Sequence, residues 1–531
     1  MIRRFLLAVA LLLTGCTSTR PVPSSPDGAA PASSSPTAQT ARYLEAHRDQ
    51  GPLLRNFLQQ MPKGGDLHTH LTGAVYAESY LEWAAEQDLC ARLDPGRIVS
   101  CSSDATAPTV PMDSVFASAE RTDRMIDALS IRNLDARPRT TGREQFFATF
   151  SRFRAVYADR PARTGDAIAE LVRRAAAQNV HHVEIILFDD ARTATGRAVD
   201  SIAATVSYTD DWALLRERLL DAGVRDAVAH GESFLDRVTA RADSLLGCSN
   251  DPLPEACRVT RRYRMHAVRV LPKTAVFARL LYGIERAVED PRVEAVDMVA
   301  PEDHRIALRN YDRHLQMLSF LRRAAGTDAD GDSVHVGLHA GELTTGLVPP
   351  EHLRDHVWDA LTIAGADRVG HAVDVGTERD TRALLDRMQR DEVAVEVCLT
   401  SNDVILGVDG REHPLPTFLD AGVPVVLATD DEGVSRIDLT HEYVRAATTY
   451  DLDYRTLKRL SRNSLHYAFL DGASLWRSRS YESYAEPCRD ADPTADAVPE
   501  ACRAFLDGNA KAAAEWRLER AFARFESSYA D

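Results

Sequence analysis

The sequence is poor in basic residues. Its 531 residues include 63 Lys and Arg against 79 Asp and Glu, which gives a net charge of −16 at pH 7. Proteins that hold the nucleic-acid backbone need clustered Lys and Arg, so this balance argues against nucleic acid as a partner. No glycine-rich GxGxxG segment follows a first strand, which disfavours a dinucleotide-binding sheet. No CxxC spacing occurs either, which excludes a thiolate zinc site.

The N-terminal apolar stretch, residues 5–13, is too short to span a bilayer. It follows Arg3 and Arg4 and ends in the segment LTGC, which resembles the lipobox of bacterial lipoproteins. The resemblance implies that residues 1–16 are a signal peptide and that Cys16 is lipidated. A plain secretory signal and an uncleaved anchor are the alternatives. We therefore expect an exported lipoprotein that reaches a membrane through its lipid anchor only, with Thr17 favouring the outer membrane where two membranes exist.

Residues 17–40 are rich in Ser, Pro, Ala and Thr and contain few large apolar side chains. Such a segment cannot pack a core, so we expect a flexible tether. The chain as a whole is 44% hydrophobic and long enough to bury a large core. We expect one domain over residues 41–531, with insertions at about 71–160 and 240–260 and a C-terminal extension at about 471–531.

Six of the eight cysteines form three couples that are close in sequence and lie in polar, loop-like segments. The couples are Cys90 with Cys101, Cys248 with Cys257, and Cys488 with Cys502. Local disulfides in an oxidising compartment explain this spacing, whereas free thiols in a cytoplasmic protein would not. Cys398 lies in the apolar run VAVEVCL and is expected to be a buried strand residue.

Short apolar runs alternate with stretches of helical periodicity from Gly64 onward. We predict strands at residues 66–70, 182–188, 266–271, 293–299, 334–339, 368–371, 393–399 and 425–429. Helical segments are predicted at residues 145–156, 166–179, 312–325, 378–390, 416–421 and 510–529. Eight strands alternating with helices favour an α/β fold, a (β/α)8 TIM-type barrel with a large insertion after the first strand and a C-terminal helical extension. An open doubly wound sheet is the runner-up.

Barrel enzymes place functional residues at the carboxyl ends of their strands, and polar residues gather at these positions here. His68 and His70 are two residues apart in a strand, so their side chains point to the same side. His339 ends the fifth predicted strand and Asp430 follows the eighth. Three histidines and a carboxylate suit Zn²⁺ and leave room for a water molecule. The alternative for each histidine alone is a hydrogen-bonded barrel residue.

Other polar residues at the same predicted end could handle protons. Glu342 lies three residues after His339, where a glutamate could move a proton between water and a substrate; a supporting or helix-start charge is its alternative role. His371 and Asp431 could hydrogen-bond the nucleophile and the substrate. The fourth predicted strand reads VEAVDMVAPED and supplies no lysine to bridge two metals, so we expect one Zn²⁺ per chain.

The segments MPKGGDLHTHLTGA, HAGE, RVGHAVD, VCLTSN and ATDDEG together resemble the adenosine deaminase family of the amidohydrolase superfamily, in order and in spacing. The resemblance covers about residues 53–470 and is closest to the secreted, growth-factor-related branch. It implies that His68, His70, His339 and Asp430 bind zinc. It assigns Glu342 to protonating purine N1, His371 to orienting or deprotonating the hydroxide, and Asp431 to holding the hydroxide and purine N7.

The substrate side departs from the family pattern at two positions. Thr72 stands where many nucleoside deaminases have an aspartate that contacts the ribose, and Ala300 stands where they have a glycine whose backbone meets purine N3. We include both in the expected substrate-binding set, which is Thr72, Gly73, Ala300, Ser401 and Asn402. These changes leave the chemistry intact and bear on the sugar side alone.

The expected function is hydrolytic deamination of adenosine or 2′-deoxyadenosine to inosine or deoxyinosine and ammonia. One alternative keeps the metal but changes the substrate to adenine, a modified nucleoside or another amidohydrolase substrate. Another is a nucleoside-binding surface lipoprotein whose barrel is catalytically idle; the presence of Glu342 and His371 beside the ligands argues against it. The expected partners are a small purine nucleoside and the membrane lipid, with a homodimer left open.

Overall fold

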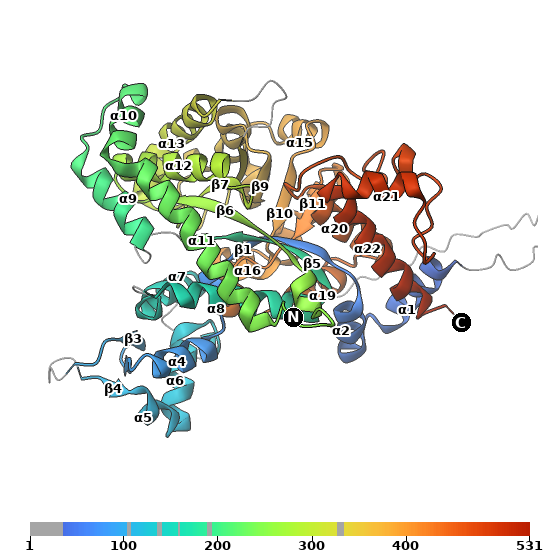
Figure 1. Ribbon diagram of the computed structural model, residues 1–531, viewed down its shortest axis with the longest axis horizontal. Helices are drawn as coiled ribbons and strands as arrows, with labels where there is room; N and C mark the ends of the chain where they lie inside the picture. Colours follow the sequence, from blue (N-terminus) through green and yellow to red (C-terminus); the bar gives the residue numbers. More distant parts are fainter. Residues whose placement is uncertain are drawn as a thin grey trace, which may run out of the picture.

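The structure is a computed structural model that describes residues 35–102, 108–134, 141–157, 160–187, 194–326 and 334–530. The predicted signal peptide, Cys16 and most of the predicted tether lie outside the described residues. The described residues centre on a barrel, with an insertion at one side and a helical extension at the other (Figure 1).

Eight parallel strands form the barrel, and consecutive strands in the chain are neighbours in the sheet. They are β1 (Gly64–His70), β5 (Val180–Ile186), β6 (Thr260–Val268), β7 (Val293–Val299), β8 (His335–Ala340), β9 (Arg368–His371), β10 (Ala394–Val397) and β11 (Val425–Leu427). A parallel bridge between Thr69 and Asp430 joins the first strand to the residues after the last. Two backbone hydrogen bonds close this seam, from His70 N to Asp430 O at 2.8 Å and from Asp430 N to His68 O at 2.9 Å. The prediction of a TIM-type barrel is confirmed.

One strand begins well before its predicted start. The third barrel strand, β6, begins at Thr260 and not at residue 266. Its first residues are arginine-rich, and their backbones pair with β5 from Thr260 onward. The barrel interior holds ion pairs, so charged residues can lie at the start of this strand. A search for apolar runs therefore places the start of the strand too late. Phe188, at the predicted end of the second strand, lies outside the described residues.

Helices follow each strand and cover the outside of the barrel (Figure 1). Between β5 and β9 they are α9 (Ala194–Thr205), α10 (Trp212–Leu219), α11 (Arg225–Leu246), α12 (Lys273–Glu289), α13 (Arg305–Ala324) and α14 (His356–Asp359). After β9 they are α15 (Thr381–Arg390), α16 (Leu399–Leu406), α17 (Leu415–Asp420), α18 (Glu432–Ser435), α19 (Leu439–Thr449) and α20 (Tyr454–His466). The loops between strands and helices therefore meet at one end of the barrel.

The first crossover carries the predicted insertion. It contains α3 (Leu71–Ala74), α4 (Ala77–Glu86), α5 (Met112–Phe116), α6 (Ala119–Leu129), α7 (Gly142–Arg152) and α8 (Pro161–Ala177), with a small antiparallel sheet of β2 (Cys90–Arg92), β3 (Arg97–Val99) and β4 (Val110–Pro111). Cys90 and Cys101 are joined there by a disulfide with an S–S distance of 2.00 Å. Most of this insertion projects from the barrel, whereas α7 lies against it and packs on α16 (Figure 1).

The two ends of the described chain pack together. Helices α1 (Pro36–His47) and α2 (Gly51–Gln60) lie beside α22 (Ala510–Ser527), where Phe57 contacts Phe525 and Tyr529. The predicted tether thus ends earlier than residue 40, because Ser35 caps α1 and Pro36 occupies its first turn, where proline needs no hydrogen-bond partner. The Thr37 hydroxyl donates to Glu526 at 2.9 Å and fixes this end to the fold.

Two more disulfides occur where the sequence couples the cysteines. Cys248 and Cys257 join the end of α11 to the turn before β6, and Cys488 and Cys502 join two segments of the extension, with S–S distances of 2.03 and 2.00 Å. Cys398 is free and buried. The extension includes α21 (Glu500–Asp507) and a small apolar core of its own.

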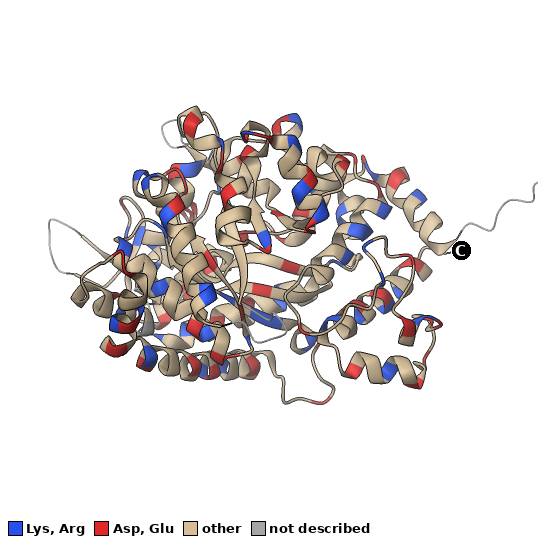
Figure 2. Ribbon diagram, turned by 90° about the horizontal axis from the view of Figure 1, so that it is seen from above, with Lys and Arg blue, Asp and Glu red and all other residues tan. Residues whose placement is uncertain are grey.

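Acidic and basic residues are interspersed over the helices, without one large region of a single sign in this view (Figure 2). Among the residues that the structure describes, no helix has the length and apolar character needed to cross a bilayer.

Candidate active site

Three histidines and one aspartate converge at the carboxyl ends of the strands. His68 and His70 come from β1, His339 from β8, and Asp430 follows β11. The Nε2 atom of His339 lies 3.0 Å from that of His68 and 3.1 Å from that of His70. Asp430 Oδ1 lies 3.3 Å from His70 Nε2 and 3.7 Å from His68 Nε2. One ligand atom from each residue thus lies within 4.8 Å of the other three.

This arrangement suits a metal ion better than hydrogen bonds. His339 donates from Nδ1 to Asp297 at 2.9 Å, so its Nε2 offers one lone pair, and two other imidazole nitrogens crowd around it. One cation at the centre would satisfy all four ligands. One zinc ion holds such ligand atoms about 2.0–2.2 Å away, so neighbouring ligands lie roughly 3–4 Å apart, as they do here, and a five-coordinate arrangement leaves a position for water. The residues therefore fit a single Zn²⁺.

Carboxylates behind the histidines fix their orientation, which the sequence analysis did not foresee. His68 Nδ1 contacts Glu396 Oε2 at 2.6 Å, and His339 Nδ1 contacts Asp297 as described. Such partners hold a ligating imidazole in one tautomer and one rotation. Burial alone would raise the pKa of Glu396, but Arg264 and Arg368 keep it well below its usual range.

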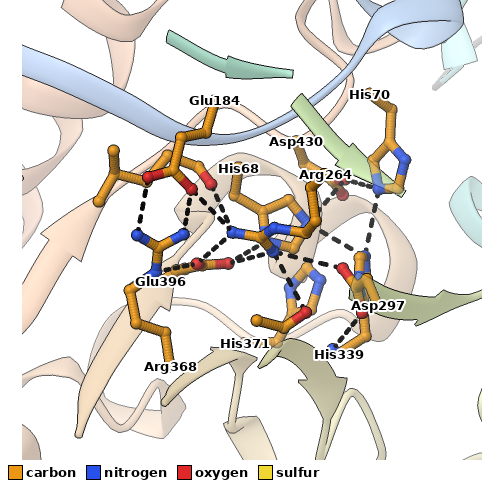
Figure 3. Close-up of polar contacts among 12 residues, drawn as sticks. His68, His70, Glu184, Arg264, Asp297, His339, Arg368, His371, Glu396 and Asp430 are labelled. Atoms are coloured by element: carbon orange, nitrogen blue, oxygen red, sulfur yellow. Dashed lines mark hydrogen bonds and ion pairs between the residues drawn. The ribbon is translucent and has the colours of Figure 1, made fainter. Parts of the chain in front are cut away.

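These charges form a layer inside the barrel. Arg264 Nη2 contacts Glu396 at 2.7 Å and its Nη1 contacts Asp297 at 3.2 Å, while Arg368 pairs with both Glu184 and Glu396 (Figure 3). Each of these residues comes from a different strand. The signal in the sequence was a charged residue inside an apolar strand, as in VAVEV and VHHVEII. A buried charge is tolerated there because each one has a partner.

A cavity of about 310 Å³ opens beside the metal ligands. Its lining includes His70, His339, Glu342, His371, Asp430 and Asp431 on one side and Phe146, Phe147, Phe150, Val268, Val299, Ala300, Pro301 and Ile405 on the other. The three phenylalanines belong to α7, in the insertion. Gly142 lets α7 approach closely, because a Cβ there would lie 2.1 Å from the carbonyl oxygen of Val404. The cavity is therefore acidic at its base and aromatic at its wall.

Glu342 points into this cavity from the loop after β8. Its Oε1 lies 4.0 Å from His371 Nε2, and its carboxyl has no hydrogen-bond partner among the described residues. Burial raises the pKa of Glu342 well above its usual range, and the carboxylates of Asp430 and Glu302 raise it further. The raised pKa favours the protonated carboxyl, which is the form that can donate a proton to a buried substrate.

Glu302 holds the backbone that carries Glu342. One Glu302 oxygen accepts from Gly341 N at 3.2 Å, and the other accepts from Glu342 N at 2.9 Å. Behind it, His356 Nδ1 contacts Glu302 at 2.6 Å. Burial alone would raise the pKa of Glu302, but His356 and Arg269 bring it down to about 2, so it is an anion. The sequence analysis missed this role, since VAPED reads as an ordinary loop.

His371, Ser401 and Asn402 lie next to the ligands. Ser401 Oγ donates to Asp430 Oδ2 at 2.5 Å, and Asn402 Nδ2 lies 3.0 Å from His371 Nδ1. Both residues are buried and neither lines the cavity in the described part of the chain. The structure thus places these two predicted substrate contacts behind the catalytic groups. Burial lowers the pKa of His371 to about 3, so its ring is neutral.

The remaining predicted substrate residues, Ala300, Thr72 and Gly73, differ in their position relative to the cavity. Ala300 lines the cavity, and its φ of +82° is a conformation that favours glycine, which is the residue the family pattern has there. Thr72 is buried away from the cavity, and its carbonyl accepts from Tyr80 Oη. Gly73 packs under Asp431, where a Cβ would lie 1.4 Å from Oδ1. Burial and the Asp430 carboxylate raise the pKa of Asp431 well above its usual range.

A second group with metal-binding side chains lies near the amino ends of the strands: His182, Glu184 and Glu294. Its carboxylates are already compensated, because Glu184 pairs with Arg368 and Glu294 lies 2.8 Å from Arg262 Nε. His182 Nε2 lies 3.7 Å from Glu184. These contacts explain the group as part of the ion-pair layer of the barrel.

The fold and the site together define a (β/α)8 barrel with a candidate metal site of three histidines and an aspartate at the carboxyl ends of its strands. Residues 255–476 match the family model described as adenosine deaminase. This match covers the second part of the barrel, from just before β6 through α20.

Curated relatives match over a limited region. An adenosine deaminase of Escherichia coli O1:K1 / APEC is 37% identical over 137 residues, which cover 26% of this chain and 38% of that protein. That of E. coli strain SE11 is 36% identical over 137 residues, with the same coverage. The match thus spans about 38% of the length of these relatives.

Two solved structures are similar at low identity. An adenine deaminase from Arthrobacter aurescens has 16% identity and a TM-score of 0.49, covering 77% of this chain and 94% of that chain. An N6-methyl-AMP deaminase from Arabidopsis thaliana has 17% identity and a TM-score of 0.49, covering 78% of this chain and 94% of that chain.

Proposed function

We propose that the protein is a zinc-dependent deaminase that hydrolyses the exocyclic amine of a 6-aminopurine nucleoside. Adenosine or 2′-deoxyadenosine would become inosine or deoxyinosine, with release of ammonia. The observation that carries this proposal is the position of the buried Glu342 carboxyl, which lines an aromatic-walled cavity together with a four-ligand metal site. An acid beside a metal site is what deamination needs, because a ring nitrogen gains a proton while the adjacent carbon is attacked.

His68, His70, His339 and Asp430 would hold the metal. When bound, Zn²⁺ would supply the Lewis acidity that turns water into a nucleophile at neutral pH. Ser401 and the carboxylates Asp297 and Glu396 keep these ligands in place. The site is buried, so the charges of its side chains are little screened by solvent.

The residues around the cavity would divide the remaining work. Glu342 donates a proton to purine N1, which makes C6 more electrophilic. His371 Nε2 lies 4.0 Å from Glu342 Oε1, and His371 would hydrogen-bond the reacting oxygen. Burial beside Asp430 raises the pKa of Asp431 well above its usual range, and its protonated carboxyl would donate to purine N7. The flat apolar wall of Phe146, Phe147 and Phe150 suits the face of a purine.

The reaction balances with water as the only co-substrate. A C6–O bond forms, the C6–N6 bond breaks, and N6 leaves as ammonia after it takes up a proton from the attacking water. Glu342 is the group placed to move protons between the ring nitrogen and the leaving amine. No redox step is needed.

A second candidate substrate class is favoured by one observation. Thr72 is buried and does not line the cavity, so the expected ribose contact is missing at that position in the described part of the chain. Free adenine, or a purine with a different group in place of the ribose, needs no ribose contact at Thr72 and would bind without loss of affinity at that position. A panel of adenosine, deoxyadenosine, adenine and N6-substituted nucleosides would separate these substrates by kcat/KM.

We also propose that the enzyme works outside the cytoplasm as a lipoprotein anchored through Cys16. The three disulfides support this, since such bonds persist in oxidising compartments. Mass spectrometry of the membrane fraction would find diacylated Cys16 as the mature N-terminus. A chain recovered in the cytoplasm with residues 1–16 attached would refute the proposal.

The Glu342→Gln variant tests the catalytic proposal. It keeps the size and loses the acid, so kcat should fall by about 10²–10⁴-fold while nucleoside binding survives. Inosine and ammonia would both be measured with the zinc-loaded protein. Wild-type protein that holds zinc and turns over none of the panel would overturn the proposal, and binding without turnover in both proteins would indicate an idle binder.

A further inference from the structure

A directional chain of hydrogen bonds lies behind His371. It begins at the backbone N–H of Leu415, at the start of α17, which donates to His413 Nδ1 at 3.1 Å. A backbone N–H can only donate, so His413 Nδ1 must be the unprotonated nitrogen. The ring proton of neutral His413 therefore sits on Nε2.

The next contact fixes the orientation of an amide. His413 Nε2 lies 3.1 Å from Asn402 Oδ1. Because His413 donates there, the oxygen of Asn402 must face it, and the amide nitrogen faces the other way. That nitrogen, Nδ2, lies 3.0 Å from His371 Nδ1. The assignment of the amide thus follows from the backbone donor at the start of the chain.

The last contact decides the state of His371. Its Nδ1 accepts from an amide N–H and cannot itself carry a proton. The ring is therefore neutral, with its one proton on Nε2. That atom is buried and has no hydrogen-bond partner among the described residues, and His371 lines the cavity. An Nε2–H group in this position is a donor to whatever oxygen occupies the cavity.

The chain is also well shielded from water. Asn402 is 0% exposed and His413 2% exposed, so solvent does not compete for these bonds. Asn402 lies within α16, and His413 lies just before α17, so two elements hold the chain rigid. The side chains of this chain, two histidines and an amide, are groups that both donate and accept.

We propose that His413 and Asn402 are positioning residues that set His371 in the Nε2–H tautomer, so that His371 donates a hydrogen bond to the nucleophilic oxygen and is not its base. The proposal rests on the proposed function for the identity of that oxygen, and it leaves proton acceptance to the Glu342 carboxylate that forms when Glu342 has protonated purine N1. An active-site histidine held in the wrong tautomer can lower kcat strongly even though the geometry of the site is unchanged.

The Asn402→Asp variant tests this most directly. The side chain keeps its size but can only accept, so His371 should move its proton to Nδ1 and turn an acceptor toward the cavity. We expect kcat to fall by about 10²-fold or more, with zinc content and KM for adenosine little changed. A purely structural role would change zinc content or KM together with kcat.

Nitrogen NMR of the zinc-loaded protein with labelled histidine reads the tautomer without any substrate. Wild-type His371 should carry its proton on Nε2, and Asn402→Asp should carry it on Nδ1. A proton on Nδ1 in wild type, or an unchanged kcat in Asn402→Asp, would overturn the proposal. If wild type deaminates no aminopurine, the proposed function fails, and the NMR result still decides the tautomer.

Two further variants complete the design. His413→Ala should lower kcat by about tenfold, because Asn402 is then free to rotate, and His413→Gln, which can both accept and donate, should restore much of it. Asn463→Asp is the matched control, since Asn463 is a buried amide that donates to Val425 O and accepts from Tyr481 Oη away from the cavity. The Asn463→Asp variant should lose stability and keep its kcat. A kcat loss equal to that of Asn402→Asp would contradict a specific role for the hydrogen-bond chain behind His371.

Discussion

The positions of individual carboxylates determine how the site can work, and several of these residues lie outside the sequence motifs described above. Glu302 is the example: it is 2% exposed and accepts from two consecutive backbone N–H groups, those of Gly341 and Glu342. Gly341 has a φ of +77°, and a Cβ there would lie 2.3 Å from Asp374 Oδ1, so the loop has one conformation. The orientation of the Glu342 carboxyl therefore depends on Glu302, because no hydrogen bond to the Glu342 side chain occurs among the described residues.

Replacing Glu302 by Gln should lower kcat about tenfold at nearly constant KM. An amide can accept from only one of the two N–H groups, and a displacement of about 1 Å at a reacting group costs up to 10²-fold. Steady-state kinetics with zinc analysis would measure this. Glu515→Gln is the control, since Glu515 accepts from Leu475 N and Ser474 Oγ in the extension; equal kinetic losses in both variants would contradict a local role.

The pH profile should follow the acid Glu342. Burial raises its pKa well above the usual range, and Asp430 and Glu302 raise it further, so the protonated form persists to a higher pH than in an exposed glutamate. A general acid is lost when it deprotonates, so kcat should fall on the alkaline side. Rates from pH 6 to 10 would show this limb, and its absence in a wild-type profile, or its persistence in Glu342→Gln, would contradict the assignment.

Among the elements, the barrel strands and helix α7 differ in how well the sequence foretold them. The strand ends were predictable because HAGE and ATDD each follow a short apolar run, the alternate spacing of HxH suits a strand, and parallel strands bring their carboxyl ends together. β6 was placed late because TRRYR begins it, and these arginines pair inside or beside the barrel. No local pattern could place α7 over the cavity, since its contact with α16 joins residues far apart in the sequence.

The wall formed by α7 should contribute to substrate binding and not to the chemical step. Phe150→Ala removes one aromatic face of the cavity, and stacking of a base on an aromatic side chain is worth about 1–3 kcal/mol. KM for adenosine should therefore rise about tenfold at nearly constant kcat. Phe116→Ala, on an exposed phenylalanine in the same insertion, is the control and should change neither constant. A fall in kcat alone for Phe150→Ala would assign α7 another role.

At the scale of the molecule, a barrel core and a separate C-terminal core are joined by helices. Leu475, Trp476, Tyr481 and Trp516 form the small core with Cys488 and Cys502, apart from the main one. Helix α22 connects this unit to α20 and α1 through Glu526 and to α2 through Phe525. The extension therefore supports the fold from outside, while the metal ligands all lie in the barrel.

Removing the Cys488–Cys502 disulfide should loosen the extension and spare catalysis. A cross-link over 14 residues is worth about 3 kcal/mol on the chain-entropy account. The double serine variant should therefore be cut by trypsin within residues 471–531 at a lower temperature than wild type, with unchanged kcat. The Cys248→Ser/Cys257→Ser pair should leave that tail resistant. Loss of deaminase activity at ambient temperature in the first variant would contradict the separation of the two units.

The central claim is that one zinc ion in the cluster of His68, His70, His339 and Asp430 makes this barrel an aminopurine deaminase. The most direct measurement is to strip the protein of metal, add Zn²⁺ in steps, and follow inosine and ammonia from adenosine at each step. We predict no turnover without metal, a linear rise as zinc is added, and saturation at one zinc per chain. Turnover that persists without metal, or a fully zinc-loaded protein that deaminates no 6-aminopurine, would contradict it.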